Sequence, residues 1–275
     1  MKNIVLVSVC SFLCVSCFSG KSSAESTKQH MSSSSQKPVE PINIVFSAPS
    51  SIPVNLIERM NAQSSEFLLD LQSVLKKDTE NLLLLVDKKN HLSPSFIPED
   101  ILPLSKNKSY NINREGLSLR RCAEEALEKM AAAARADGVT LLVSSSYRSY
   151  EYQEKVYERN VRELGKEAAD RESAMPGASQ HQLGTAVDFG SITDAFADTA
   201  AGKWLSVHAE EYGWSLSFPQ GYEDITGYRW ESWHYLYIGK EAAAFQAKWF
   251  GGIQHYMIEF IDAWKKQASS QKTFS

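Results

Sequence analysis

The irregular order of helical and strand patterns after residue 118 constrains the fold more than any other feature of the chain. Apolar residues at spacings of three and four predict a helix over residues 118–137, which Gly138 then stops. The segment "VTLLVSSSYRSYEYQEKVYERNVRELG" predicts a strand, a turn and a second helix, which Ser149 can cap and Gly165 ends, whereas "GTAVDFG" and "HYLYIG" predict short strands. A helix that Gly213 stops separates these two strands. Because the strands and helices follow no regular βαβ rhythm, we expect an α+β fold with a small antiparallel sheet and flanking helices.

Helical patterns also lie on both sides of this region. The segment "PVNLIERMNAQSSEFLLDLQSVLKKD" predicts one or two helices within residues 41–79, and residues 241–275 predict helices broken at Gly251 and Gly252. Between them, "NLLLLVDKKNHLSPSFIPEDILPL" predicts an extended segment that wraps a domain. Hydrophobic residues make up 43% of the chain, which suffices for a core. We therefore expect a domain over residues 80–240, with helical extensions that serve packing or partner contact.

The first 17 residues carry the pattern of a secretory signal. A basic residue precedes an apolar run over residues 4–18, which is too short to span a bilayer. Cysteines follow small residues here, as at lipoprotein cleavage sites, and we expect Cys17 to be the lipid attachment site. Cys10 or Cys14 can serve instead. The signal can also be cleaved without lipid attachment, or the segment can stay in the fold as a helix.

Residues 18–40 are rich in Ser, Lys and Gln, which predicts a flexible tether. A tether behind a lipid-bearing cysteine lets a domain reach away from a membrane surface. The sequence therefore predicts an extracytoplasmic lipoprotein, anchored in a membrane and facing the periplasm or cell envelope. The net charge is −4, from 29 basic and 33 acidic side chains, so nucleic acid is not an expected partner.

Cys122 is the last cysteine once the leader is removed. Since no internal disulfide can then form, the fold must depend on its core or on a metal. Cys122 lies on the apolar stripe of its predicted helix, which favours a buried small hydrophobe over a reactive thiol.

Two histidines and two carboxylates are placed unusually in the second half of the chain. Asp188 lies among apolar neighbours in "AVDFG", where a carboxylate needs a partner, and a bend at Gly184 can bring His181 to it. Alternatively, Asp188 caps a turn. In "GYRWESWHYLY", Glu231 is costly to bury without a role, and His234 is either a core residue or a ligand. Two histidines and one carboxylate are a common ligand set for catalytic zinc, and a second carboxylate can deprotonate the zinc-bound water.

Strand geometry raises a difficulty for this set. Residues 231 and 234 point to opposite faces of a regular strand. If both serve one site, the chain must turn or bulge between them. We therefore predict a local irregularity at Ser232 and Trp233.

Arg148 follows an apolar strand and precedes a helix, which places it at a rim or a pocket. Its guanidinium can hold a carboxylate in a two-pronged bond, and Gln153, one turn into the helix, can assist. Alternatively, Arg148 is a surface arginine that pairs with Glu151 or Glu154.

Four segments in this order, "SSSYRSYEYQ", "GASQHQLGTAVDFG", "YGWSLSFP" and "TGYRWESWHYLYIG", resemble the signatures of VanY-type D-alanyl-D-alanine carboxypeptidases, a family of zinc peptidases. The related L,D-carboxypeptidases share these patterns. The resemblance runs from about residue 81 to residue 239, which is well over half of the chain. It implies a small α+β domain of the hedgehog and D,D-peptidase type, with an antiparallel sheet and one Zn²⁺ ion.

The resemblance also implies a role for each member of the candidate set. The pattern "SxHQxGxAVD" implies that His181 and Asp188 are zinc ligands. The pattern "ExWH" implies that Glu231 is the catalytic base and that His234 is the third ligand.

The pattern "YRSxxxQ" implies that Arg148 and Gln153 bind the terminal carboxylate of the substrate, with Ser179 lining the pocket. Two positions depart from the family. Gln180 stands where an acidic residue is frequent, and Ser217 stands where a basic residue is frequent. Neither change removes a ligand, but both can alter the pocket.

These observations lead to four hypotheses about function. The first is a D,D-carboxypeptidase that trims the pentapeptide stem of peptidoglycan, with Trp230, Trp233 and Tyr235 excluding water from the site. The second is an L,D-carboxypeptidase that trims a tetrapeptide stem with the same residues. The third is a non-catalytic cell-wall binding lipoprotein, and the fourth is a membrane receptor for a peptide.

Overall fold

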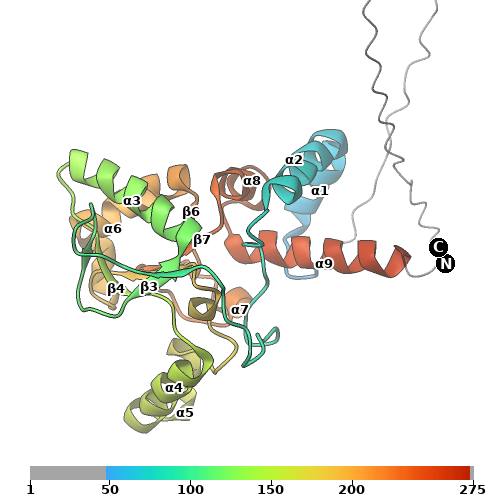
Figure 1. Ribbon diagram of the computed structural model, residues 1–275. Coiled ribbons are helices and arrows are strands. Elements are labelled where there is room, and N and C mark those ends of the chain that lie inside the picture. The colour runs from blue at the N-terminus through green and yellow to red at the C-terminus, as the bar shows by residue number, and fades with distance from the viewer. Residues whose placement is uncertain (1–47, 273–275) are drawn as a thin grey trace, which may run out of the picture. The chain divides into compact units, whose positions relative to one another are not determined.

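The computed structural model describes residues 48–272 (Figure 1). The predicted signal peptide, the expected attachment site Cys17 and the tether lie outside the described residues, as do residues 41–47. Between residues 48 and 272, no helix combines the length and the apolar character needed to cross a membrane.

A five-stranded sheet forms the centre of the fold. Its strands run in the order β2-β4-β5-β7-β6, and every neighbouring pair is antiparallel except β2 and β4, which are parallel. The strands are β2 Asn111–Ile112, β4 Leu142–Ser145, β5 Ala186–Phe189, β6 Trp214–Leu216 and β7 His234–Tyr237. A separate antiparallel pair joins β1 Ile101–Pro103 to β3 Ser118–Arg120. The predicted α+β class with a small, mainly antiparallel sheet is confirmed.

One face of the sheet packs against α3 (Arg121–Ala136) and α6 (Ala200–His208). Val187 and Tyr235 point to this face and share a core with Leu127 of α3. Side chains alternate along a strand, so the residues on either side of Val187 and Tyr235 point to the other face.

The opposite face is covered by helices from both ends of the described chain. Ala186 of β5 and Leu236 of β7 belong to this second core. The helices are α1 Val54–Ala62, α2 Ser64–Lys77, α8 Lys240–Phe250 and α9 Gln254–Lys272, and Figure 1 shows them gathered on one side of the sheet. Residues at even positions of β5 and β7 therefore point either into this core or into the space next to it.

Aromatic side chains join the helices from the N-terminal end of the described chain to those from its C-terminal end. The ring of Phe67 in α2 lies 5.2 Å from that of Trp249 in α8 and 5.3 Å from that of Phe260 in α9. The predicted break between the last two helices is confirmed, because Gly251 and Gly252 have φ values of 62° and 78°. The helical segments at the two ends of the chain thus share one core, which the sequence patterns did not reveal.

The starts of two predicted helices show where local sequence patterns predict the structure correctly and where they do not. The second helix, α4 (Tyr150–Leu164), begins as predicted after Ser149, whose hydroxyl accepts the N–H of Tyr152 at 3.2 Å. The predicted helix over residues 118–137 was wrong in its first turn, because residues 118–120 pair with β1 and α3 begins at Arg121. Pairing between distant segments overrode the local helical pattern there.

The segment over residues 81–100 contains turns and bends but neither helix nor strand. It is tied down by hydrogen bonds from the central region. The N–H of Leu92 donates to the carbonyl of Gly177 at 2.8 Å, and the amide of Gln182 donates to the carbonyl of Ser93 at 3.0 Å. These hydrogen bonds hold the segment against the central region, whereas its turns and bends show that, contrary to the prediction, it is not extended throughout.

Candidate metal centre

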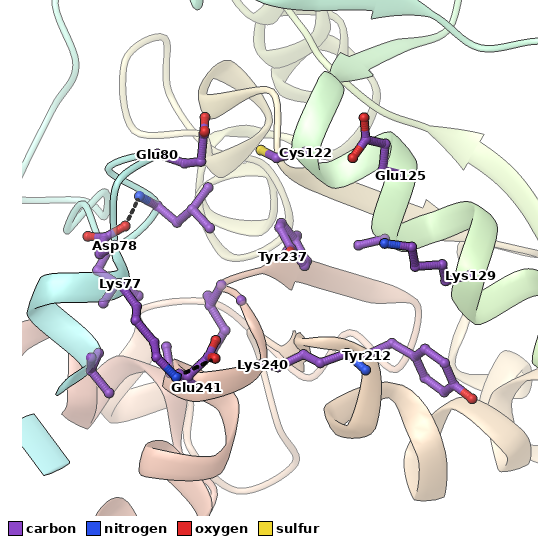
Figure 2. A pocket seen from close by; sticks show the side chains of 17 residues that line it. Lys77, Asp78, Glu80, Cys122, Glu125, Lys129, Tyr212, Tyr237, Lys240 and Glu241 are labelled. Atoms are coloured by element: carbon purple, nitrogen blue, oxygen red, sulfur yellow. Dashed lines mark hydrogen bonds and ion pairs between the residues drawn. The ribbon is translucent and has the colours of Figure 1, made fainter.

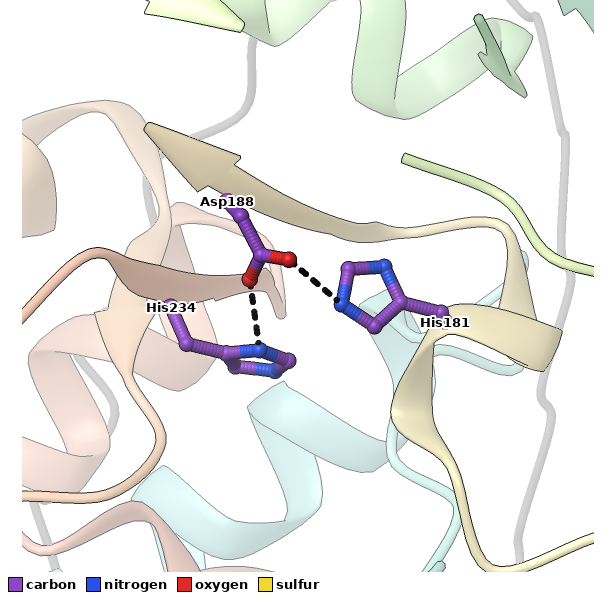
Figure 3. A group of neighbouring side chains, drawn as sticks. All are labelled: His181, Asp188 and His234. Atoms are coloured by element: carbon purple, nitrogen blue, oxygen red, sulfur yellow. Dashed lines mark hydrogen bonds and ion pairs between the residues drawn. The ribbon is translucent and has the colours of Figure 1, made fainter. Parts of the chain in front are cut away.

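Strand register brings Asp188 and His234 side by side. The two residues are direct partners in the antiparallel pair β5–β7, so their side chains leave the same face of the sheet. Asp188 Oδ1 lies 2.9 Å from His234 Nδ1, and Asp188 Oδ2 lies 3.2 Å from His181 Nε2 (Figure 3). The three side chains, here called the histidine cluster, are 3–5% exposed.

His181 reaches the cluster from the short 3₁₀ helix η1 (Gln180–Leu183). The hydroxyl of Ser179 accepts the N–H of His181 at the start of η1, and Gly184 ends the helix in the left-handed conformation with φ 72°. A side chain at Gly184 would also collide with Ile101, whose Cδ1 would lie 2.6 Å from the added Cβ. The predicted bend at Gly184 is therefore confirmed, and glycine is required there.

The second nitrogen of His181 fixes the orientation of the ring. His181 Nδ1 lies 2.7 Å from the carbonyl oxygen of Ser146, which can only accept a hydrogen bond. The proton of the neutral ring is therefore on Nδ1, and the lone pair on Nε2 points toward Asp188. A backbone carbonyl that holds a histidine in this way is typical of metal sites.

Burial sets the protonation of this cluster. Burial, with help from the positive charge of Arg148, lowers the pKa of His181 to about 4, so the ring is neutral at pH 7. Asp188 Oδ2 accepts a hydrogen bond from Arg148 Nη2 at 3.0 Å, and this positively charged donor favours the ionised carboxylate. The cluster therefore offers imidazole nitrogen and carboxylate oxygen in the states that bind a metal.

The donor set fits a zinc ion. The ligand atoms of the histidine cluster all lie within 4.8 Å of one another. The Nε2 lone pair of His181 faces Asp188 Oδ2 at 3.2 Å, and two acceptors in contact call for a cation between them. Two imidazoles and one carboxylate are ligands that zinc favours, and three protein ligands leave room for a water or a substrate.

Glu231 lies beside this cluster. Its Oε2 is 3.6 Å from His234 Nδ1, and its N–H donates to the carbonyl of Phe218 at 3.0 Å. The predicted irregularity is confirmed, because Ser232 and Trp233 form a turn that brings residues 231 and 234 to the same side. Burial and the nearby charge of Asp188 raise the pKa of Glu231 well above its usual range.

Arg148 lies in this site and not on the surface. Its Nη2 donates to Asp188 Oδ2 at 3.0 Å and to Ser145 Oγ at 2.9 Å, and its Nη1 donates to Gln153 Oε1 at 3.1 Å. Gln153 is fully buried and donates in turn to the carbonyl of Ala174 at 2.7 Å. The alternative pairing of Arg148 with Glu151 or Glu154 is therefore wrong.

A cavity of about 270 Å³ opens onto the site and includes Ser179 in its lining. Two further lining arginines, Arg159 and Arg229, escaped the sequence analysis. Arg159 lies six residues after Gln153 on α4. Helical spacing places Val156 and Asn160 on the same face of α4 as Gln153, and both residues line the cavity. This spacing could have identified α4 as a wall of the cavity from the sequence.

The aromatic residues around the site differ from expectation in one respect. Tyr235 belongs to the core on the opposite face of the sheet, because it alternates with His234 along β7, so the expectation that it shields the site was wrong. Phe218 takes that place, with its ring 4.8 Å from the ring of His234. Trp233 lines the cavity as expected, and Trp230 is half-buried.

A second hollow, of about 350 Å³, lies between α2, α3 and the start of α8 (Figure 2). Next to it, Glu80, Asp100 and Cys122, here called the cysteine cluster, also bring potential ligand atoms within 4.8 Å of one another. Arg120 already pairs with both carboxylates, at 2.7 Å from Asp100 and 2.8 Å from Glu80.

Cys122 is half-buried at the edge of this hollow, and is therefore less buried than expected for a small hydrophobe of the core. Burial raises the pKa of its thiol to about 11, and the proton therefore stays on sulfur at pH 7. Both carboxylates of the cysteine cluster are paired with Arg120 and its thiol is protonated, so the cluster presents no free anionic ligand to a metal.

Comparisons with known proteins agree with this geometry. The sequence model of VanY, D-alanyl-D-alanine carboxypeptidase, matches residues 116–240. The chain is similar to YodJ of Bacillus subtilis (strain 168), which is provisionally named a carboxypeptidase. The identity is 35% over 202 residues, which cover 68% of this chain and 74% of that protein.

Two solved structures are also similar. One is the LdcB LD-carboxypeptidase, with 32% identity and a TM-score of 0.59 over 67% of this chain and 88% of that chain. The other is a variant of the vancomycin resistance D,D-pentapeptidase VanY in complex with Zn(II), with 30% identity and a TM-score of 0.54 over 64% of this chain and 98% of that chain.

Proposed function

The chain belongs to the VanY family of D-alanyl-D-alanine carboxypeptidases, and from this premise we propose that it removes the C-terminal D-alanine from peptidoglycan stem peptides with one zinc ion. One observation carries the proposal. A buried cavity holds the histidine cluster, a carboxylate beside it and an arginine within reach of a substrate's terminal carboxylate. This is the set of groups that hydrolysis of a terminal peptide bond requires.

The histidine cluster would hold the zinc through His181, Asp188 and His234, and zinc in such a site acidifies a water and polarises the scissile carbonyl. Glu231 accepts the proton of the attacking water and passes it to the leaving amine of D-alanine. Glu231 is placed for both transfers, because its Oε2 lies 3.6 Å from His234 Nδ1 at the edge of the histidine cluster.

Arg148 recognises the terminal carboxylate, which limits the reaction to the last residue of the peptide. A guanidinium has five N–H groups, and the hydrogen bonds of Arg148 to Ser145, Asp188 and Gln153 leave one of them, on Nη1, for the substrate. A two-pronged bond to the substrate therefore requires Arg148 to release Gln153 or Asp188. Ser179, in the lining of the same cavity, stands beside this position.

The test is the release of free D-alanine by the purified protein from muropeptides with pentapeptide and tetrapeptide stems, with and without a chelator. Chelator-sensitive release from the pentapeptide supports the D,D-carboxypeptidase. Glu231→Gln is the matched control, because it keeps the shape of the site and removes the base. Absence of release from either stem, with zinc bound, would contradict the proposal and favour a cell-wall binding protein or a peptide receptor.

An L,D-carboxypeptidase is the second candidate function. The similarity to the LdcB LD-carboxypeptidase over 88% of that chain favours it. Release from the tetrapeptide stem alone would identify this activity. The same ligands, base and arginine serve both reactions, so the residue that the cavity accepts before the scissile bond, D-alanine or the L-centre of the preceding stem residue, decides between them.

We also propose that the protein works outside the cytoplasm, at the surface of a membrane, with Cys17 as the lipid attachment site. The apolar run before Cys17 and the polar tether over residues 18–40 support this location, as does a peptidoglycan substrate. Metabolic labelling with a fatty acid tests the proposal. Wild-type protein should carry the label and Cys17→Ala should not, and labelling of Cys17→Ala would instead point to Cys10 or Cys14.

A further inference from the structure

A chain of side-chain amides connects the histidine cluster to the first residue of α9. Gln180 Oε1 lies 3.0 Å from His234 Nε2, on the side of the ring that faces away from Asp188. Gln180 Nε2 donates to Gln254 Oε1 at 3.2 Å. Gln254 is 2% exposed, and its own Nε2 donates to the carbonyl oxygen of Ser215 at 3.3 Å.

The hydrogen bond from Gln254 to Ser215 sets the donor and acceptor directions of this series of amide hydrogen bonds. A backbone carbonyl can only accept, so Ser215 requires Gln254 to present its NH₂ group to it. The oxygen of Gln254 then faces Gln180, which must present its own NH₂ group there. The oxygen of Gln180 is consequently turned toward His234 Nε2, and the ring must donate from that nitrogen.

The proton on Nε2 leaves the lone pair of the neutral His234 ring on Nδ1. That nitrogen faces Asp188 Oδ1 at 2.9 Å and Glu231 Oε2 at 3.6 Å, inside the histidine cluster. A partner that binds the outer nitrogen of a histidine ligand fixes both its tautomer and its orientation. The carbonyl of Ser146 fixes the tautomer and the orientation of His181 in the same way, through a direct hydrogen bond.

We propose that Gln180 and Gln254 are positioning residues of the zinc centre, and that the glutamine at 180 makes this centre dependent on α9. This inference rests on the proposed zinc-dependent function. A carboxylate at position 180 would have two equivalent oxygens and would accept from His234 in either orientation, whereas an amide must be oriented. Gln254 supplies the orientation from outside the matched region 116–240. Gln254 is the first residue of α9, the last helix of the described chain (Figure 1).

Zinc affinity of the full-length protein, measured by competition with a chelator, tests this directly. Gln180→Leu should weaken zinc binding by about 10–100-fold, as expected for loss of a partner that orients a ligand. Gln254→Leu should weaken it less, by up to about tenfold, because Gln180 stays in contact with His234 but loses its preferred orientation. Gln180→Glu should bind zinc at least as tightly as wild type.

The decisive measurement is the effect of Gln254→Leu in two backgrounds. It should weaken zinc binding when residue 180 is glutamine but not in Gln180→Glu, because a carboxylate needs no orientation and one of its oxygens would face the oxygen of Gln254. Gln246→Leu is the matched control. Gln246 is a buried amide of α8 that accepts from Ser215 Oγ at 2.9 Å and donates to the carbonyl of Gly252, without contact to Gln180. Its loss should lower the melting temperature but not the zinc affinity.

Equal effects of Gln254→Leu in both backgrounds, or equal changes in zinc affinity for Gln246→Leu and Gln254→Leu, would overturn the inference and leave Gln254 a packing residue. The outcome is separable from that of the proposed function. A protein with the expected zinc affinities that releases no D-alanine would contradict only the function. A protein that hydrolyses stem peptides and binds zinc equally well in all variants would contradict only the positioning role.

Discussion

The histidine cluster and the cysteine cluster both hold their ligand atoms within 4.8 Å of one another, but they differ in the protonation and the partners of those atoms. Each carries an arginine, with Arg148 at 3.0 Å from Asp188 in one and Arg120 at 2.7 Å from Asp100 in the other. Arg120 satisfies both carboxylates of its cluster, whereas Arg148 occupies one oxygen of Asp188 and leaves the imidazoles untouched.

Burial acts in opposite directions on the two kinds of ligand. It lowers the pKa of His181 and thereby keeps the lone pair that a metal needs. It raises the pKa of Cys122 and thereby keeps the proton that a metal must displace. The comparison teaches that a buried imidazole is ready for a metal without further help, whereas a buried thiol is ready only if a positive charge or the metal itself removes its proton.

The same substitution in both clusters should give the largest contrast. Asp188→Asn removes a ligand and the charge that zinc needs, so bound zinc should be lost on dialysis and D-alanine release should fall by at least about 10³-fold. Asp100→Asn should leave both unchanged, because Arg120 retains Glu80. Metal analysis and turnover of the two variants check this, and zinc loss in Asp100→Asn would mean that the cysteine cluster holds the metal.

Removing the base should separate binding from chemistry within the histidine cluster. Glu231→Gln keeps the volume of the side chain and should retain zinc with little change. The turnover number should fall by about 10²–10⁴-fold, the usual contribution of a general base. Single-turnover hydrolysis, with zinc content as the control, measures the effect. Full activity of the variant would show that another group takes the proton.

Substitution of Arg148 and substitution of Arg120 should also differ in their effect on kcat/KM. Arg148→Ala should lower kcat/KM by about 10–100-fold through loss of a charged hydrogen bond to the substrate. A peptide with an amidated C-terminus should be a poor substrate for wild type and should show no further loss in the variant. Arg120→Ala is the matched change and should lower stability without altering kcat/KM. An equal loss on both peptides in Arg148→Ala would assign that arginine to the metal site alone.

Acid should destabilise the zinc-free protein through His181. Between pH 6.5 and about 4 the unfolded chain binds a proton on this ring and the folded chain does not, so the free energy of unfolding falls as pH falls. The total loss over that window is about 3 kcal/mol. The raised pKa of Glu231 contributes the opposite slope, since its folded form keeps a proton that the unfolded form releases.

Urea unfolding of Glu231→Gln in the presence of a chelator, at several pH values from 7 to 4, measures this slope. Burial also lowers the pKa of His255, which adds a slope of the same sign, so the contribution of His181 is the difference that His181→Gln makes in that variant. An unchanged slope after this substitution would place the titrating group elsewhere.

The smallest effect should come from the thiol. Cys122→Ser should change zinc content and turnover by less than about twofold, since the protonated thiol binds no metal. Labelling of Cys122 by a thiol reagent at pH 7 should be slow compared with a free cysteine, because little thiolate is present. Rapid labelling at pH 7 would contradict the raised pKa and reopen the cysteine cluster as a ligand site.

Sequence alone determined the features that depend on neighbours along the chain. Helical spacing and capping located α4, the break at Gly251 and Gly252 and the bend at Gly184. Strand alternation showed that Glu231 and His234 could share a site only if the chain turned between them, and it does. These features are local because a few backbone angles and the next turn of helix decide them.

Only the tertiary structure decided the features that depend on pairing between distant segments. The strand β3 replaced the first turn of a predicted helix because β1 pairs with it, and Gln254 reaches Gln180 across 74 residues of chain. The difference between the clusters belongs here as well, because the burial of His181 and the salt bridges of Arg120 arise only when the chain is folded. The sequence determines the type of each side chain. The folded structure determines its protonation and its partners, because these depend on which groups are buried together away from water.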